Sequence, residues 1–259
     1  MDGGGDGQVI LSAGRSRFTL ASLPIDEFPV LSGGDLPHQF TFTAAELRGL
    51  IDRTRFAISN EETRYYLNGI YLHALEEDGA ALLRAVATDG HRLARVQITQ
   101  PVGAADMPAI IIPRKTVGEV QKLLEEAEGE VSVQVSDTKI SFAFDNIVLT
   151  SKLIDGKFPD YTRVIPVDND KVLGVDAKTF AQSVDRVSAI SSEKSRAVKL
   201  SLDTDSLGLS VSNPDSGNAS DEISVSYQAE PLEIGFNARY LMDITSQLDG
   251  EMATFELSN

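Results

Sequence analysis

Residues 87–94, Ala87-Thr88-Asp89-Gly90-His91-Arg92-Leu93-Ala94, lie between two runs of strand-forming residues. The Asp89 side chain can accept hydrogen bonds from backbone amides, and Gly90 tolerates positive φ, so the stretch predicts a tight turn. The run before it, residues 70–87, is typical of a strand hairpin closed by an acidic turn. Hairpins joined by tight turns indicate antiparallel sheet, and we expect such a sheet at the centre of the fold.

A second segment, Arg64-Tyr65-Tyr66-Leu67-Asn68-Gly69, precedes this hairpin. The turn would bring His91, Arg92 and Leu93 close to it. Together the two segments offer a small patch of aromatic, leucine, arginine and histidine side chains. The alternative is an ordinary turn at the rim of a sheet, with no binding role.

The composition is that of an ordinary globular protein. The 259 residues, 42% of them hydrophobic and 24% charged, suffice for about two domains. No apolar run approaches the roughly 20 residues of a membrane-spanning helix, and we expect a cytoplasmic protein without a membrane partner. Cysteine is absent, and the three histidines are not paired at metal-ligand spacing. We therefore expect neither a metal nor another cofactor.

The chain repeats itself after about 130 residues, which is typical of an array of similar domains. Asp52-Arg53 and the Ala-Ile-Ser run that follows recur at Asp185-Arg186. Residues 9–29 resemble residues 139–159, including the pair Phe28-Pro29. We expect residues 1–36 to be the end of one repeat plus a linker, 37–166 a whole repeat plus a linker, and 167–259 a third repeat that stops early. The chain would then be a piece of a longer three-repeat protein, cut at both ends.

Four helices are expected, over residues 44–58, 114–127, 177–190 and 237–248. Thr43 and Glu46 fit a capping box for the first, and Asp176 and Asn237 are suitable N-caps for the third and fourth. The apolar face of the fourth helix is expected to be Tyr240, Leu241, Ile244 and Leu248. With alternating strands between the helices, the pattern predicts an α+β fold of repeated domains, each with two helices on antiparallel sheet.

The net charge of −16 argues against a conventional high-affinity DNA-binding protein, because phosphate contacts need clustered Lys and Arg. It allows a protein that surrounds DNA, provided that the basic residues share one surface. Basic residues do fall on the four expected helices, and the tyrosine pair could add stacking contacts to exposed bases. The DNA-facing residues so predicted are Arg48, Arg53, Arg55, Arg64, Tyr65, Tyr66, Arg114, Lys115, Lys122, Lys178 and Arg186. The alternative for each is a solvated helix face.

Three motifs, RYYLNG (64–69), VATDGHRLA (86–94) and TSKLIDGKFPDYTRVIP (150–166), resemble those of the bacterial sliding clamp family, the β subunit of DNA polymerase III. The resemblance implies repeated clamp domains, three per subunit, which form a homodimeric ring in the full-length protein. The ring would encircle duplex DNA without sequence specificity, with helices lining the hole. Its other partners would be the replicative polymerase, the clamp loader and other clamp-binding peptides.

The resemblance also implies a peptide-binding pocket between the middle and third domains. Its wall would consist of Leu67, Thr88, Gly90, His91, Arg92, Leu93, Pro159, Arg163, Val164, Asn237 and Tyr240. Ser195 stands where some family members have a bulky apolar residue, and the C-terminal segment that completes the family's pocket is absent.

No phosphate-binding G-x-x-x-x-G-K-[ST] loop and no G-x-S-x-G nucleophile motif occurs, and an Asp-Gly-His turn does not orient an imidazole toward a separate nucleophile. We expect a protein that is not an enzyme. The rival function is a repeat-domain interaction scaffold with no nucleic-acid role. Such a scaffold would share the pocket but would lack a common basic surface.

Overall fold

The computed structural model describes residues 2–4, 7–27, 34–191 and 196–259. The chain divides into two compact units, Met1–Leu36 and Pro37–Asn259. The expected features at Phe28-Pro29 and Ser195 lie outside the described residues.

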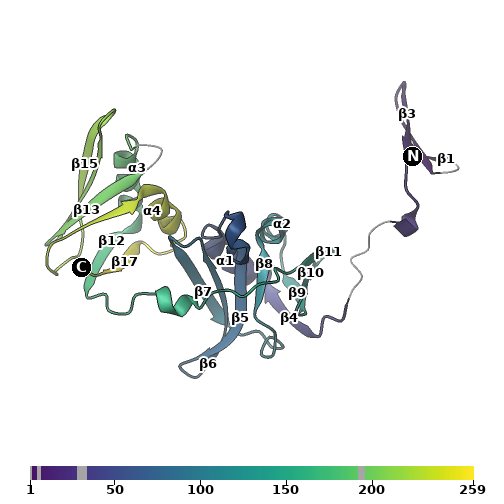
Figure 1. Ribbon diagram of the computed structural model, residues 1–259, viewed down its shortest axis with the longest axis horizontal. Coiled ribbons are helices and arrows are strands. Elements are labelled where there is room, and N and C mark those ends of the chain that lie inside the picture. Colours follow the sequence, from purple (N-terminus) through teal and green to yellow (C-terminus); the bar gives the residue numbers. More distant parts are fainter. Residues whose placement is uncertain (1, 5–6, 28–33, 192–195) are drawn as a thin grey trace. The chain divides into compact units, whose positions relative to one another are not determined.

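The first unit is a three-stranded antiparallel meander (Figure 1). Its strands are β1 (Asp2–Gly4), β2 (Gln8–Ala13) and β3 (Ser16–Ala21), and a short 3-10 helix η1 (Ile25–Glu27) follows them. Gly14 has a φ of +58°, which suits the tight turn between β2 and β3. β2 and β3 therefore form a hairpin.

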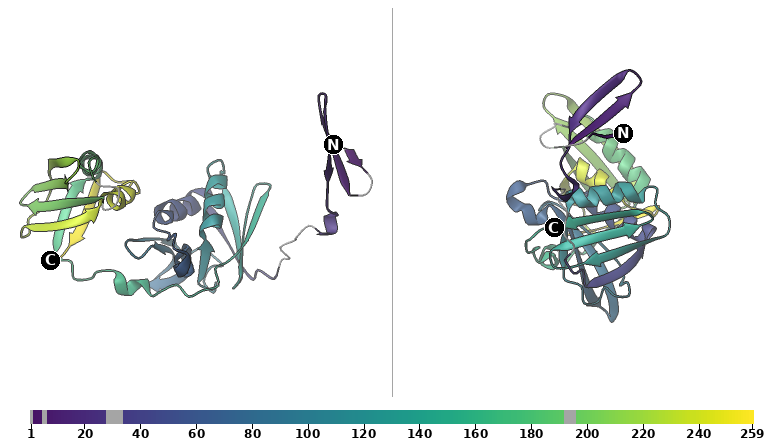
Figure 2. Two further views of the ribbon diagram at one scale, coloured as in Figure 1. Left: turned by 45° about the horizontal axis from the view of Figure 1, so that its top comes forward. Right: turned by 90° about the vertical axis from the view of Figure 1, so that its right-hand side faces the viewer.

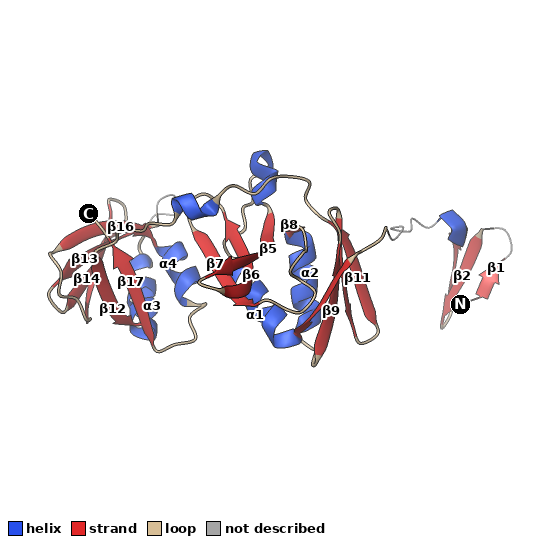
Figure 3. Cartoon of the chain, turned by 90° about the horizontal axis from the view of Figure 1, so that it is seen from below, coloured by secondary structure: helices blue, strands red, loops and turns tan. Residues whose placement is uncertain are grey.

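The second unit begins with a complete α+β repeat. Its elements are β4 (His38–Thr43), α1 (Ala44–Arg55), η2 (Glu62–Leu67), β5 (Gly69–Glu77), β6 (Ala80–Thr88), β7 (Leu93–Thr99), β8 (Ile110–Pro113), α2 (Arg114–Leu124), β9 (Glu130–Val135), β10 (Lys139–Phe144) and β11 (Ile147–Lys152). They form two antiparallel sheets, ordered β7-β6-β5-β8 and β11-β10-β9-β4, and α1 packs on α2 between them (Figure 3).

One core joins both sheets and both helices of this repeat. Every second residue of β9 is fully buried, at Val131, Val133 and Val135, as the alternating pattern predicts. On α1, Leu47 and Leu50 are buried, at the spacing of one helical face. Burial of each such side chain stabilises the fold by about 1.5–3 kcal/mol. This core holds the sheet β7-β6-β5-β8 in place, and the central turn connects β6 to β7 of that sheet.

A second, shorter repeat with its own core follows (Figure 2). After a 3-10 helix η3 (Tyr161–Val164), its elements are β12 (Lys171–Asp176), α3 (Ala177–Ser188), β13 (Ala197–Asp203), β14 (Ser206–Asn213), β15 (Gly217–Ser224), β16 (Leu232–Asn237), α4 (Ala238–Thr245) and β17 (Met252–Leu257). The sheet β15-β14-β13-β16 has the strand order of β7-β6-β5-β8, and the pair β12-β17 matches β4-β9. The meander β1-β2-β3 likewise has the order of β9-β10-β11. This topology confirms the internal repeat and the α+β class.

All four helices are shorter than predicted. They end at Arg55, Leu124, Ser188 and Thr245, whereas we expected ends near residues 58, 127, 190 and 248. The residues beyond each end form tighter turns, in which an amide bonds the carbonyl three positions earlier, as Ala57 does with Thr54. Asn237 lies just outside α4 as its N-cap. The capping box of Thr43 and Glu46 and the cap at Asp176 are present as expected.

The apolar face predicted for α4 is wrong in part. Leu241 is buried, but Ile244 and Leu248 are 37% and 42% exposed. The core receives Ala238 and Thr245 together with the correctly predicted Leu241, and these three lie three and four residues apart on one side of the helix. Leu248 also lies beyond the last helical residue, so helical spacing no longer governs its direction.

Within the described residues, no helix is both long and apolar enough to cross a membrane.

Candidate functional site

The central turn has the conformation that its sequence predicts. The Asp89 carboxylate accepts hydrogen bonds from the amides of His91 (2.9 Å) and Arg92 (3.0 Å), and the Thr88 hydroxyl donates to the Arg92 carbonyl (2.7 Å). Gly90 has a φ of +87°, and a Cβ added there would lie 2.5 Å from a guanidinium nitrogen of Arg64. The turn therefore favours glycine for its positive φ, and a side chain there would also have to displace the end of the Arg64 side chain.

Arg64 ties this turn to η2. Its Nε donates to Glu61 (2.8 Å) and its Nη2 to the Asp89 carbonyl (3.1 Å). The hydrogen bond from Arg64 holds the pKa of the Glu61 carboxyl below its usual range. Beside Arg64, Tyr65 is 53% exposed and meets the half-buried Tyr66 ring edge to face. Of these predicted DNA-facing side chains, Tyr65 is thus the one most open to solvent.

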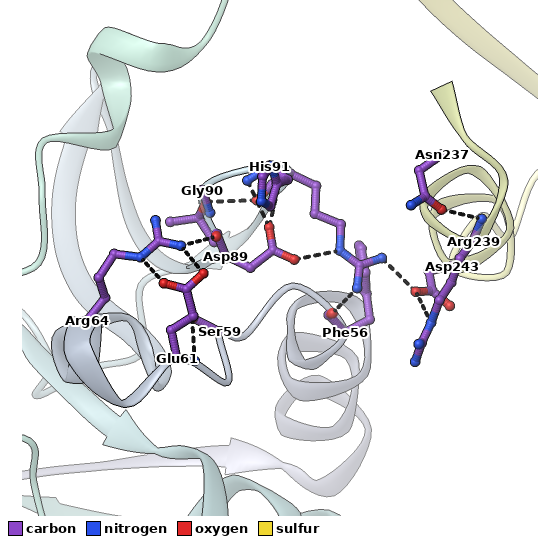
Figure 4. A network of polar contacts seen from close by, with 12 residues as sticks. Phe56, Ser59, Glu61, Arg64, Asp89, Gly90, His91, Asn237, Arg239 and Asp243 are labelled. Carbon is purple, nitrogen blue, oxygen red and sulfur yellow. Dashed lines mark hydrogen bonds and ion pairs between the residues drawn. The ribbon is translucent and has the colours of Figure 1, made fainter. Parts of the chain in front are cut away.

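Arg92 forms a bridge between the two repeats of the second unit, and Figure 4 labels its partners Asp89, Phe56 and Asp243. Its guanidinium bonds Asp243 on α4 (2.6 Å), Asp89 in the turn (3.2 Å) and the carbonyl of Phe56 at the end of α1 (2.7 Å). It also lies over the ring of Tyr240, 4.4 Å from its centroid. Only 11% of the Arg92 side chain is exposed. We call this set of contacts the Arg92 bridge.

The two third-repeat residues predicted for the pocket, Tyr240 and Asn237, lie on or next to α4, beside the Arg92 bridge. The rings of Tyr240 and exposed His91 stack, with centroids 6.3 Å apart. The Asn237 side chain accepts a hydrogen bond from the Arg239 amide (2.9 Å), so it caps α4 with its oxygen atom. A cavity of about 720 Å³ opens beside these side chains. Its lining includes Phe56, Glu61, Asp89, His91, Arg92, Arg114, Arg239, Tyr240 and Asp243.

A separate apolar cluster gathers the leucines of the predicted pocket. It consists of Leu67, Val86, Ile111, Phe158 and Tyr161, with Leu93 and Ile165 packed against it, and we call it the linker cluster. The segment that joins the two repeats therefore docks on the sheet of the first through its apolar side chains.

The other predicted pocket residues on this segment are solvent-facing. Pro159, Arg163 and Val164 are exposed, Val164 to 67%. Pro159, Arg163 and Val164 thus lie on the docked segment, and Leu67 and Leu93 lie on the part of the first repeat against which that segment packs. Thr88, Gly90, His91 and Arg92 lie on the adjoining turn.

The basic residues predicted to face DNA are mostly held by partners within the protein. The Arg48 guanidinium donates to the carbonyl of Leu124, the last residue of α2. This cation at the helix C-terminus offsets the unfavourable acidic residues Glu125 and Glu126 that follow it. Arg48 is half-buried, so its main contact is structural.

The other helix cations fall into two groups. Paired cations are Arg53 with Asp249, Arg55 with Gln121, Lys122 with Glu119, and Arg186 with Asp221. Arg114, Lys115 and Lys178 are exposed. Since α1 packs on α2 and α3 on α4, and Arg53 reaches the segment after α4, the basic helices of the two repeats adjoin.

Sequence reasoning missed several residues that shape this site. Phe56 and Asp243 act through partners distant in the sequence, which no local pattern reveals. Arg84 is only 2% exposed, and its position inside the apolar run of β6 was a usable signal, because buried arginines need polar partners. Among the described residues, no group of three or more acidic or histidine side chains is arranged to hold a metal ion.

Comparisons with known proteins agree with this architecture. A family model described as the central domain of the DNA polymerase III beta subunit matches residues 41–160, and one for its C-terminal domain matches residues 162–259. The beta sliding clamp of Caulobacter vibrioides is 51% identical over 256 residues, which are 99% of this chain and 69% of that protein. That of Escherichia coli is 35% identical over 254 residues, 97% of this chain and 68% of its own.

Solved structures show the same likeness. The sliding clamp from Bartonella birtlesii, bound to griselimycin, superposes with a TM-score of 0.93 at 50% identity, covering 98% of this chain and 68% of that one. The clamp from Pseudomonas aeruginosa gives a TM-score of 0.88 at 38% identity and covers the same shares.

Repeated α+β domains, each with a helix pair on antiparallel sheet, define a clamp-type protein. The family models and relatives are more specific. The chain belongs to the family of beta sliding clamps, the beta subunits of DNA polymerase III.

Proposed function

We propose that the chain works as part of a sliding clamp, a processivity factor that surrounds duplex DNA without sequence specificity and tethers polymerases to it. The observation that carries the proposal is the linker cluster, because it places Leu67 and Leu93 under a docked segment whose solvent side bears Pro159, Arg163 and Val164. Family membership points to the same function. The role is binding rather than catalysis, it needs no cofactor, and it is exercised in the cytoplasm.

In this proposal, residues 1–36 are the end of the first clamp domain plus its linker. Residues 37–166 are the middle domain with its linker, and residues 167–259 belong to the third. Two full-length subunits would close the ring as a homodimer. β15 supports this part of the proposal, because it lies at the edge of its sheet, where unpaired backbone groups can accept a strand from another subunit.

The DNA-facing surface is proposed to lie on the four helices and η2. Arg114, Lys115 and Lys178 are the best candidates for phosphate contacts, because among the exposed helix cations of the described chain they are the ones without an ion pair or side-chain partner. Tyr65 is the best candidate for stacking. Arg53, Arg55, Lys122 and Arg186 could contribute only by exchanging their present partners. Direct affinity for linear DNA should therefore be weak, since retention by a ring is topological.

The peptide site is proposed to bind short segments of polymerases, the clamp loader and other clamp-binding proteins. Such a segment would carry a Gln followed by Leu and an aromatic residue, as the family implies. The half-buried Leu93 supplies an apolar contact, the buried Leu67 supports this wall from beneath, and Arg163 supplies a charge at the edge.

Fluorescence anisotropy with a labelled peptide containing Gln, Leu and Phe in that order tests this function. Arg163→Ala and Leu93→Ala should each weaken binding roughly tenfold, the loss typical of an anchor side chain. Arg163 is exposed, so its removal should leave the fold intact. Lys178→Ala, an exposed change on α3, is the control and should leave binding unchanged. Equal weakening by Lys178→Ala, or no binding by the unaltered chain, would reject the proposed site.

A repeat-domain scaffold without a nucleic-acid role remains the second candidate. It would bind the same peptide. Only the DNA surface separates the two functions, and a salt-dependent affinity for duplex DNA that falls on substitution of Arg114 or Lys115 would favour the clamp.

A further inference from the structure

The linker segment of residues 158–165 alternates between anchoring and exposed side chains. Phe158 and Tyr161 are each 6% exposed and belong to the linker cluster. The residues between and after them, Pro159, Arg163 and Val164, face solvent. Whatever holds Phe158 and Tyr161 in place therefore sets the position of the proposed peptide-binding wall.

Aromatic rings on β5 provide the apolar part of this anchor. The Phe158 ring stacks on Tyr71, with centroids 4.7 Å apart and planes 1° from parallel. Tyr71 in turn stacks on His73 (4.8 Å) and meets the edge of Tyr161 (6.4 Å). Stacked rings contribute attraction but can slide over one another, so stacking alone does not fix the rotation of the segment.

A buried polar group fixes the rotation. The Tyr161 hydroxyl oxygen accepts a hydrogen bond from Arg84 Nη1 (3.1 Å) and lies 3.0 Å from His73 Nε2. Because Arg84 donates to this oxygen, the hydroxyl hydrogen is available for His73 Nε2. The other ring nitrogen, Nδ1, lies 3.3 Å from the Ala74 carbonyl, to which it donates. Since a carbonyl can only accept, the proton of a neutral His73 would lie on Nδ1, and Nε2 would then accept from the Tyr161 hydroxyl.

Docking of the linker on the sheet of the first repeat therefore depends on Tyr161. Arg84 has two further partners, Gln97 (2.9 Å) and Glu77 (2.6 Å), both on its own sheet. Tyr161 is the partner that the linker supplies. If the linker left, the nearly buried Arg84 guanidinium would lose one of its partners, and an unmet buried charge is unfavourable.

We propose that Tyr161, held by Arg84 and His73, is a positioning residue of the peptide site: it keeps the linker docked so that Pro159, Arg163 and Val164 form one wall. The peptide part of this inference rests on the proposed function. The docking part does not, and it can be measured without any peptide.

The docking part is tested with a nitroxide on the linker. The chain has no cysteine, so Val164→Cys gives a single labelling site on an exposed residue. Tyr161→Phe keeps the ring and removes the hydroxyl, and it should make the label more mobile. The matched control is Tyr227→Phe, because this buried tyrosine donates to the Glu230 carbonyl and belongs to the core of the third repeat, not to the linker cluster. Tyr227→Phe should leave the label unchanged.

Peptide affinity is then measured on the same two variants without Val164→Cys or the label. Tyr161→Phe removes the hydroxyl that joins Arg84 and His73 and should weaken peptide binding at least about fivefold, the change that corresponds to about 1 kcal/mol. Tyr227→Phe should not weaken it. An unchanged label mobility in Tyr161→Phe overturns the anchor, and so does an equal effect of Tyr227→Phe. A mobile label with unchanged affinity overturns the positioning role. If the unaltered chain binds no peptide, the proposed function fails, and the label alone decides whether Tyr161 anchors the linker.

Discussion

The Arg92 bridge should couple the two repeats energetically, and a double-mutant cycle measures that coupling. Arg92→Gln and Asp243→Asn each remove one charge of the pair while keeping the side chains similar in size. Arg92 is 11% exposed and Asp243 31%, so water screens the pair only partly. Hydrogen bonds between charged groups contribute about 1.5–3 kcal/mol when buried. Discounted for the exposure of Asp243, the coupling energy should be about 1 kcal/mol.

The assay is urea unfolding of the two single variants, the double variant and the unaltered chain, followed by circular dichroism because the chain contains no Trp. The chain offers a matched control in Arg53 and Asp249, which also join the two repeats but are 45% and 78% exposed. That pair should couple by about 0–0.5 kcal/mol and should lose its coupling in high salt. If both pairs couple equally, or if salt abolishes the Arg92 coupling, burial is not the source of its strength.

Three further outcomes follow from the structure. Gly90→Ala should destabilise the fold by about 1–3 kcal/mol in urea unfolding, because of its positive φ and because the new side chain displaces Arg64. Gly79 also has a positive φ (+76°) but has open space around it, so Gly79→Ala should destabilise the fold less. Equal losses of stability would show that the contact with Arg64 does not matter. Burial lowers the pKa of His73, so as the pH falls the unfolded chain takes up the proton before the folded chain does. Stability should therefore fall as pH drops below about 6.5. His73→Gln should remove that part of the decline in urea unfolding, and an unchanged decline would contradict it. Binding of linear duplex DNA should weaken by orders of magnitude between about 50 and 200 mM salt, and salt-resistant nanomolar binding in a filter or anisotropy assay would exclude the proposed surface.

Local features of the fold were predictable from the sequence because their causes are local. The capping box of Thr43 and Glu46, the buried alternation of β9 and the turn at Asp89-Gly90 each depend on residues within a few positions of one another. Helix ends were less predictable, since the tighter final turns use ordinary residues such as Phe56. The repeat was visible because whole motifs recur, and the topology then followed.

The partners of long side chains could not be predicted. Arg48 and Arg92 lie at positions that suit a solvated helix face and a pocket wall, yet both bond carbonyls at helix ends. Ile244 was placed in the core by spacing alone, but small residues on the other side of α4 pack there instead. In each case a contact distant in sequence decides the outcome. The peptide-site residues came from the resemblance, and only their support by the linker cluster came from the structure.

The internal pairing of the helix cations has a consequence for movement along DNA. A protein that slides must leave each phosphate as readily as it meets it, and the rate of leaving falls tenfold for every 1.4 kcal/mol by which a contact deepens. On the proposed DNA-facing surface, Arg53, Lys122 and Arg186 already have carboxylate partners, so a phosphate of the duplex would compete with an acidic side chain for each of them. Such competition flattens the energy profile along the duplex. A surface of unpaired arginines would hold DNA more tightly and would travel along it more slowly.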